Sequence, residues 1–184
     1  MAQIDSIVLG MVMTNCYLLW NNHHVLIVDP ATKSEKIKQL IDVRGGIVDG
    51  IYLTHGHFDH IGGVDAYVHL YHCPVYINDP DMRLLSDPYS NVSAGGHEVI
   101  VKSEAIGLQP GKNQIGGFTF DLVDAPGHTE GSCLMIWEGA MICGDVLFQG
   151  SIGRTDLVGG SSTKMYQSLQ MIKTLNPDLQ VYPG

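Results

Sequence analysis

Short apolar runs separated by turn residues open the chain and predict β-strands. Residues 4–9, 16–20 and 25–28 are such runs, and the Asn-Asn-His-His stretch at 21–24 is typical of a hairpin turn. A fourth run, residues 47–53, is almost continuously apolar and predicts a strand that is buried on both faces. The opening part of the chain is therefore expected to consist largely of strands.

Three segments repeat apolar residues at helical spacing. Residues 32–35 read Thr-Lys-Ser-Glu, which fits a capping box, and the helix that follows is expected to end near the glycines at 45–46. The other two predicted helices cover residues 64–71 and 161–175. Helices that alternate with strands at both ends predict an α/β layered fold in which helices cover the faces of sheets. We expect one such domain over residues 1–184.

The second half of the chain is dominated by short predicted strands. Residues 100–101, 104–107 and 118–123 alternate in the manner of antiparallel strands, and residues 133–143 form a hairpin pattern. Single strands are expected at 74–77 and 179–182. The stretch at 87–96 is rich in Asp, Ser, Asn, Pro and Gly, and predicts a long surface excursion that covers a site.

Composition and charge narrow the classes of function. Of the 184 residues, 45% are hydrophobic and only 16% are charged, which favours a packed core over disorder. The net charge of −9 argues against nucleic acid and anionic membranes as partners, because both require basic patches. No segment approaches the roughly 20 apolar residues of a membrane span, and the first residues do not resemble a signal peptide.

The cysteines also point to the cytoplasm. They are far apart and form no Cys-x-x-Cys pair, so neither a disulfide scaffold nor a zinc knuckle is expected: Cys16, Cys73, Cys133 and Cys143. Each lies beside apolar residues and is predicted to be a buried, reduced thiol. Cys143 has a second interpretation as a residue that lines the site, because it precedes a carboxylate by two positions.

The densest group of chemically active residues lies at 54–63, which reads Thr-His-Gly-His-Phe-Asp-His-Ile-Gly-Gly. Neutral imidazole and carboxylate are the groups that bind Zn²⁺ and similar divalent cations. On an extended segment His55 and His57 point the same way, whereas the adjacent Asp59 and His60 cannot both share that direction. The spacing therefore favours two neighbouring sets of ligands over a merely solvated polar loop.

Two further stretches carry possible ligands. Residues 124–132 form a turn with Pro and Gly that presents His128 at its tip, and Asp145 follows an apolar strand. Taken alone, Asp145 fits a turn cap better than a ligand. His23, His24 and His97 have no other ligand types in a metal-binding pattern around them, and are expected to be surface residues.

The order of three motifs resembles the metallo-β-lactamase superfamily, and within it the glyoxalase II-like hydrolases. The motifs lie at 54–63, at 126–132 (Pro-Gly-His-Thr-Glu-Gly-Ser) and at 144–148 (Gly-Asp-Val-Leu-Phe). The resemblance implies an αββα sandwich with metals at one edge between two facing sheets. It also implies a first metal site and a second one that share a bridging carboxylate: His55, His57, His128 and Asp145 for the first, and Asp59, His60 and Asp145 for the second.

The chemistry that this resemblance implies is hydrolysis. Two divalent ions about 3.5–4 Å apart share a water and lower its pKa, so that a metal-bound hydroxide attacks an acyl carbon. Asp59 is the expected catalytic residue, because it is placed to orient the hydroxide or accept its proton. A thioester suits such a site, since a thiolate leaves without a strong general acid. Zn²⁺ is the expected metal, with Fe or Mn as alternatives.

One departure from the family concerns the last strand. In the family it is followed by Pro-Gly-His, whereas this chain ends at Pro183-Gly184. We therefore expect a second site without its third histidine and a shortened or proteolysed C-terminal part. The expectation for this chain is one bound metal or none, with a second site that is weak or empty.

The substrate remains open at this level. Arg154, in the Gly-Arg-Thr-Asp loop at 153–156, either pairs with a substrate carboxylate or forms an internal ion pair with Asp156. The loop is similar to that of short bacterial glyoxalase II-like proteins and of persulfide dioxygenases. The first choice is a hydroxyacylglutathione-type thioester hydrolase, and the second is a mononuclear iron persulfide dioxygenase. An inactive binding domain is the third, if the short C-terminus is native. β-Lactam hydrolysis is disfavoured by the lack of a secretion signal, and nuclease activity by the charge.

Overall fold

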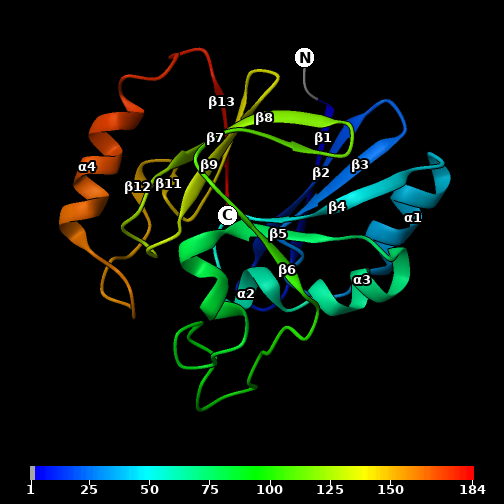
Figure 1. Ribbon diagram of the computed structural model, residues 1–184, viewed down its shortest axis with the longest axis horizontal. Helices are drawn as coiled ribbons and strands as arrows, with labels where there is room; N and C mark the ends of the chain where they lie inside the picture. The colour runs from blue at the N-terminus through cyan, green and yellow to red at the C-terminus, as the bar shows by residue number, and fades with distance from the viewer. Residues whose placement is uncertain (1–2) are drawn as a thin grey trace.

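Two β-sheets face each other in the computed structural model, which describes residues 3–184 (Figure 1). The first sheet has six strands in sequential order: β1 (Gln3–Leu9), β2 (Thr14–Asn21), β3 (His24–Val28), β4 (Ile47–Leu53), β5 (Val75–Asn78) and β6 (Ala105–Leu108). The second has the order β13-β10-β9-β8-β7: β7 (Gly111–Ile115), β8 (Phe118–Asp124), β9 (Cys133–Trp137), β10 (Ala140–Gly144) and β13 (Gln180–Pro183). A small ribbon pairs β11 (Leu147–Phe148) with β12 (Ser151–Ile152).

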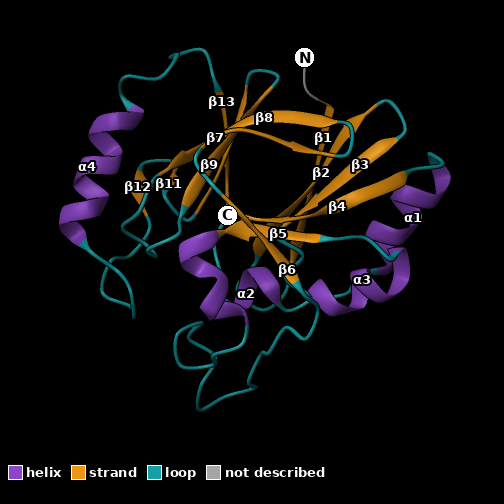
Figure 2. Cartoon of the chain, viewed as in Figure 1, coloured by secondary structure: helices purple, strands orange, loops and turns teal. Residues whose placement is uncertain are grey.

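Helices lie outside both sheets (Figure 2). The helices α1 (Glu35–Val43) and α3 (Val64–Tyr71) cover the first sheet, and α4 (Ser162–Ile172) covers the second. The short α2 (Phe58–Ile61) and the 3₁₀ helix η1 (Asp79–Leu85) lie near the edge where the two sheets meet. The predicted αββα fold is confirmed. No helix within residues 3–184 is both long and apolar enough to cross a membrane.

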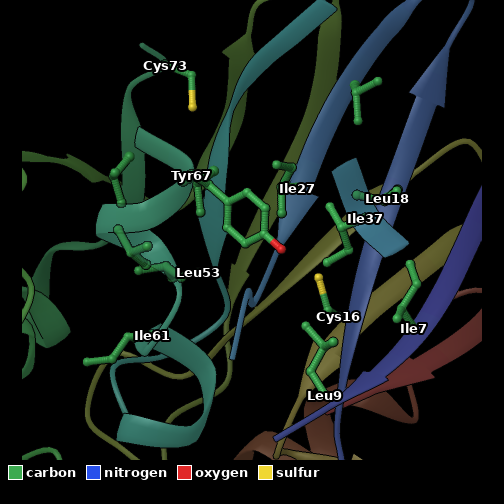
Figure 3. Packing of buried hydrophobic residues seen from close by; sticks show 14 of the residues in the cluster. Ile7, Leu9, Cys16, Leu18, Ile27, Ile37, Leu53, Ile61, Tyr67 and Cys73 are labelled. Atoms are coloured by element: carbon green, nitrogen blue, oxygen red, sulfur yellow. The ribbon is translucent and has the colours of Figure 1, made fainter. Parts of the chain in front are cut away.

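The continuous apolar runs of the first sheet arise because successive side chains point to opposite faces and both faces are buried. On β2, Leu18 packs in the cluster beneath α1 and α3, whereas Leu19 packs in the cluster between the two sheets. Figure 3 shows the first of these clusters, in which Ile37 of α1 and Tyr67 of α3 approach Ile27 of β3. Both faces of these central strands are thus removed from water, as in sheets covered on each side.

The second sheet has its own helix-facing cluster. Met141 of β10 and Leu134 of β9 pack with Met165 of α4, and all three are at most 2% exposed. The amphipathic pattern predicted for residues 161–175 therefore has a clear physical basis. The helix begins after Ser161, whose hydroxyl accepts a hydrogen bond from the Lys164 N–H.

Several predicted elements differ from the structure in instructive ways. The capping box at 32–35 is wrong: α1 begins after Ser34, whose side chain makes no capping bond and whose N–H donates to Tyr67 Oη. A tertiary contact with α3 has replaced the local cap. Burial on both faces of β4 holds only for its second half, because Ile47 at its start is 58% exposed.

The largest difference between the predicted and the observed topology lies at the edge of the first sheet, in strand β6. Residues 104–107 were expected to pair antiparallel, but β6 runs parallel to β5, and residues 100–101 belong to no strand. The chain leaves β5 through η1 and the long excursion, so it returns to the sheet edge in the same direction. The strand β7 was not predicted, because its polar Lys-Asn-Gln centre hides the pattern. The hairpins β2–β3 and β9–β10 are confirmed.

A single cavity mutation tests the packing beneath α1. Leu18 is fully buried in the cluster of Figure 3, so Leu18→Ala is expected to lower the free energy of unfolding by about 2–5 kcal/mol. Val43, at the end of α1, is 87% exposed, and Val43→Ala should change the free energy of unfolding by no more than about 0.5 kcal/mol. Urea unfolding of the two variants checks this, and equal midpoints would contradict the layer assignment.

Candidate metal centre

The predicted ligands meet where strand ends from both sheets converge. Three histidines follow β4, one lies in the turn between β8 and β9, and a carboxylate follows β10: His55, His57, His60, His128 and Asp145. Because β4 belongs to the first sheet and β8 to β10 belong to the second, the site lies at one edge between the sheets.

Three histidines form the first group. The possible ligand nitrogens of His55, His57 and His128 lie within 4.8 Å of one another. His57 Nδ1 is 2.8 Å from His128 Nε2, and none of the three residues is more than 3% exposed. The structure therefore brings together the three histidines predicted for the first metal, and their role as ligands stays a prediction.

A second group of possible ligands, His55, His60 and Asp145, shares His55 with the first, and Asp59, which was predicted for the second metal, is not part of it. His60 Nε2 is 3.3 Å from Asp145 Oδ1 and 3.8 Å from Asp59 Oδ2. The other oxygen of Asp145 is 3.5 Å from His128 Nε2. Asp145 thus lies between the two groups, as predicted for a bridging ligand. Gly184 packs against the same group, since a Cβ placed on it would lie 2.2 Å from Asp145 Oδ1.

Hydrogen bonds fix which nitrogen of each histidine faces the centre. His128 Nδ1 donates to the Arg154 carbonyl oxygen over 2.8 Å, so its Nε2 faces the group. His55 Nδ1 is 3.1 Å from Thr54 Oγ1, which likewise leaves Nε2 inward. Partners of this kind orient metal-binding imidazoles and raise their basicity.

Asp29 supports both groups and was not predicted as a functional residue. Its Oδ2 accepts hydrogen bonds from Thr54 Oγ1 at 2.7 Å and from His60 Nδ1 at 2.9 Å. Its Oδ1 accepts the Thr54 N–H, and the residue is only 1% exposed. Through Thr54 it also orients His55. The sequence did contain a signal for this residue. Asp29 directly follows the buried strand β3, and β3 pairs with β4, the strand that precedes the histidines.

Asp81 was also missed, and it joins the two loops that carry the first group. Its Oδ2 accepts from the Gly56 N–H at 3.1 Å and from Thr129 Oγ1 at 2.7 Å. Its Oδ1 accepts from the Gly131 N–H at 2.7 Å. A Cβ on Gly131 would approach Asp81 to 2.7 Å, so the glycine permits this close contact. One fully buried carboxylate thereby holds the loops of His57 and of His128 together.

The buried imidazoles fit a divalent cation. His55 Nε2 and His57 Nε2 are buried and have no hydrogen-bond partner, and leaving such atoms unpaired costs free energy. Burial and the neighbouring histidines lower the pKa of His55 well below its usual value and lower the pKa of His57 to about 3. Both rings are therefore neutral, which is the form that binds metals.

His60 has a different electrostatic setting. Burial alone would lower its pKa, but the carboxylates of Asp29 and Asp145 raise it well above the usual value. Burial likewise opposes ionisation of Asp145, yet the contact with His60 lowers its pKa overall. At neutral pH His60 thus carries a second proton directed at Asp145. A cation held by these two residues would displace that proton.

Three contacts describe the surroundings of the centre. Thr14 Oγ1 donates to Asp59 Oδ2 at 3.3 Å and helps to orient that carboxylate. Arg154 makes a two-point ion pair with Asp156, with N···O distances of 2.8 and 2.7 Å, as one of its two interpretations expected. Cys143 is buried with its thiol directed at backbone carbonyls, as the first interpretation of this residue had it.

The variant Asp29→Asn tests the supporting role of this carboxylate. Asp29 has a φ of +48°, which asparagine also tolerates, so the backbone is preserved while one acceptor becomes a donor. His60 loses its orienting partner, and we expect metal affinity to fall about 10- to 100-fold. Competition with a chromogenic chelator measures this. An affinity within twofold of the wild type, with an unchanged melting temperature, would contradict it.

Comparison with known sequences gives a consistent family. The profile described as "Metallo-beta-lactamase superfamily" matches residues 9–184. The chain is similar to the "Probable metallo-hydrolase YqgX" of Bacillus subtilis, with 38% identity over 87% of this chain and 78% of that one. It is also similar to the "Hydroxyacylglutathione hydrolase" of Photorhabdus laumondii, with 34% identity over 85% of this chain but only 55% of that protein.

Solved structures agree with this. The "BLEG-1 B3 metallo-beta-lactamase" has a TM-score of 0.93 and 35% identity, covering 99% of this chain and 91% of that one. "TTHA1623 in a di-iron-bound form" has a TM-score of 0.87 and 30% identity, covering 98% and 91%. The likeness to "ETHE1 from Myxococcus xanthus", with a TM-score of 0.79 and 22% identity over 99% and 75%, concerns the fold alone.

Proposed function

The chain belongs to the metallo-beta-lactamase superfamily, and from this we propose that it is a metal-dependent hydrolase of acyl thioesters of the S-lactoylglutathione type. The metal-hydrolase class accords with the histidine and carboxylate groups and with the relative from Bacillus subtilis. The thioester part of the proposal is supported by the name of the relative from Photorhabdus laumondii. The chain spans only 55% of the length of that relative, so the thioester substrate is a proposal for this chain.

The observation that carries the proposal is the lining of the cavity over the centre. This cavity has a volume of about 330 Å³ and is lined by His57, His128, Asp145 and Asp59, among others. Its lining contains no serine, threonine or cysteine. A hydroxyl or thiol nucleophile is therefore lacking among the described residues of this wall. This favours an attacking oxygen that comes from water, with the histidines and carboxylates of the wall as metal ligands or bases.

The residues have separable roles in this reaction. A divalent ion, when bound, would activate water and polarise the acyl oxygen. His55, His57 and His128 would hold one ion, and Asp145 lies between that group and His60. Asp59, oriented by the Thr14 hydroxyl, is placed at the cavity to accept a proton from the attacking water.

A second candidate is a mononuclear iron persulfide dioxygenase. The observation behind it concerns the metal only: a structure with 30% identity was determined in a di-iron-bound form, which supports iron as a possible metal of this chain. The single ion and the persulfide substrate are the parts that the assay below tests. The same histidine groups could hold iron, since imidazole and carboxylate also suit that metal. The identity of the metal therefore belongs to the experiment.

Metal-specific assays distinguish the two candidates. The purified chain, reconstituted separately with Zn²⁺, Mn²⁺ and Fe²⁺, is assayed for hydrolysis of S-lactoylglutathione and for oxygen consumption with glutathione persulfide. The proposal predicts thioester hydrolysis that a chelator abolishes and that oxygen does not affect. Oxygen consumption by the iron form, without thioester hydrolysis by any form, would replace it with the second candidate.

A further inference from the structure

A second and larger cavity adjoins the one over the metal centre. It has a volume of about 720 Å³, which is within the range of small-molecule sites. Four residues line both cavities: Val12, Phe58, Asp59 and Val92. The larger cavity therefore lies directly beside the place where the reaction is proposed to occur.

One wall of the larger cavity is an exposed apolar turn. Met11 and Val12 line the cavity and are 99% and 57% exposed, although they lie between two strands of the first sheet. Met13 beside them is 69% exposed. Consecutive apolar side chains kept in water at the edge of a cavity indicate a binding surface. Thr14, the next residue, contacts Asp59, so this wall is anchored at the metal centre.

The opposite wall is formed by the excursion after η1, and it is held by a buried asparagine. Asn91 Nδ2 donates to the carbonyl oxygens of Leu84 and Val99 at 2.9 and 2.8 Å. Its Oδ1 accepts from the N–H and the hydroxyl of Ser93. The Phe58 N–H donates to the Asn91 carbonyl oxygen at 3.0 Å, which fixes this wall to α2. The excursion therefore presents a defined surface.

Val92 is held in an unfavourable backbone conformation at the junction of the two cavities. Its φ is +67°, in the left-handed region that β-branched residues rarely adopt. Strain of this kind persists where the surrounding structure enforces it, and it concentrates at ligand sites. Here the hydrogen bonds of Asn91 enforce it.

The charges of the larger cavity disfavour anionic groups. Its lining holds the carboxylates of Asp59 and Glu98 and one histidine, His97, and contains neither lysine nor arginine. Carboxylates or phosphates of a thiol carrier would find no fixed positive side chain there. Arg154 lines the smaller cavity instead, beside the ligands. The two cavities thus differ in the chemistry that they can accept.

We propose that the larger cavity binds the acyl group of the substrate, and that this group is uncharged and apolar, with a medium-length chain or an aryl ring. This inference rests on the proposed thioester hydrolysis and defines its substrate class. Water adds to the carbonyl carbon and the carbon–sulfur bond breaks. One of the two protons of the water leaves with the sulfur as a thiol, and the other is released to solvent as the acyl group departs as a carboxylate. The thiol part lies on the side of Arg154.

The first test varies only the acyl group. Glutathione thioesters of lactate, acetate, butyrate, hexanoate and octanoate are compared with the reconstituted chain. Full burial of one methylene corresponds to about fourfold in affinity, so kcat/KM for the hexanoyl thioester should exceed that for the acetyl thioester by at least about tenfold. Equal or falling values along the series, with the lactoyl thioester best, would overturn the inference while leaving thioester hydrolysis intact.

The second test uses variants and a readout that needs no turnover. Val92→Asp places a charge in the junction, and its φ suits aspartate better than valine, so folding is not expected to suffer. The matched control is Val43→Asp, at a position that is 87% exposed on α1. Octanoate and acetate binding are measured by calorimetry on the zinc-loaded chain. We expect octanoate to bind at least about tenfold more tightly in the wild type and in the control, and to lose that advantage in Val92→Asp.

The two tests separate the inference from the proposed function. Selective octanoate binding that Val92→Asp removes, without hydrolysis of any thioester, would reject the proposed function and support the apolar cavity. Octanoate that binds no more tightly than acetate, or an advantage that survives Val92→Asp, would reject the cavity assignment.

Discussion

The variant His128→Ala is expected to lose the metal of the first group and with it nearly all hydrolytic activity. His128 supplies one of three buried imidazoles, and its ring is held by the Arg154 carbonyl oxygen. Alanine leaves only His55 and His57 at this group. Loss of a residue that merely orients a ligand costs about 10- to 100-fold in affinity or activity, so loss of the ligand itself should exceed about a hundredfold.

Metal content and turnover are measured together for this variant. His23→Ala is the control, because His23 is an exposed residue of the β2–β3 turn. It should retain wild-type metal content and activity. Turnover by His128→Ala within about threefold of the wild type, at equal metal content, would show that His128 is not a ligand.

The variant Asp145→Asn is expected to weaken metal binding at both groups at once. Its two carboxylate oxygens face different partners, with His60 on one side and His128 on the other. Asparagine keeps the shape but removes the charge and offers one oxygen only. Where the wild type fills both groups, the variant should therefore bind less metal than either His60→Ala or His128→Ala, each of which alters one side of Asp145 only.

Calorimetric titration of the three variants with Zn²⁺ separates the alternatives. If Asp145 were only a turn cap, which is the interpretation that its place in the sequence favours when taken alone, Asp145→Asn would keep wild-type affinity at the first group. Thermal unfolding of each variant provides the control for folding. An affinity of Asp145→Asn equal to that of His60→Ala would also contradict a bridging position.

Most of the candidate ligands could be singled out because their signal is local. The segment from His55 to His60 contains four potential ligands in six positions, and His128 stands at the tip of a Pro-Gly turn. Asp145 became a candidate only through the resemblance to a family. Its position between the two groups depends on β10 and β4 meeting at one edge, which no local pattern encodes.

The supporting residues could not be predicted for the same reason. Asp29 reaches His60 because β3 and β4 are parallel neighbours, so that their carboxyl ends lie together. Asp81 reaches Gly131 across 50 positions of sequence. In both cases a single aspartate has no pattern of its own, and its function appears only when the strand order is known.

Backbone geometry accounts for the remaining differences. The parallel direction of β6 depends on the path of the excursion before it, and the start of α1 depends on Tyr67 replacing a local cap. The left-handed conformation of Val92 is imposed by the hydrogen bonds of Asn91. Composition indicated a surface excursion at 87–96 beside a site, and residues 92–96 do line the larger cavity; the hydrogen bonds that hold this wall in place have no pattern in the sequence.

The central claim is that the buried histidine groups hold a divalent metal that the reaction requires. The most direct measurement strips the chain with a chelator, adds Zn²⁺ in steps, and records bound metal and thioester hydrolysis in the same samples. The account predicts that hydrolysis is absent at first and rises in proportion to the metal bound at the group of His55, His57 and His128. Hydrolysis that is already complete in the stripped chain, or that never follows metal binding, would contradict it.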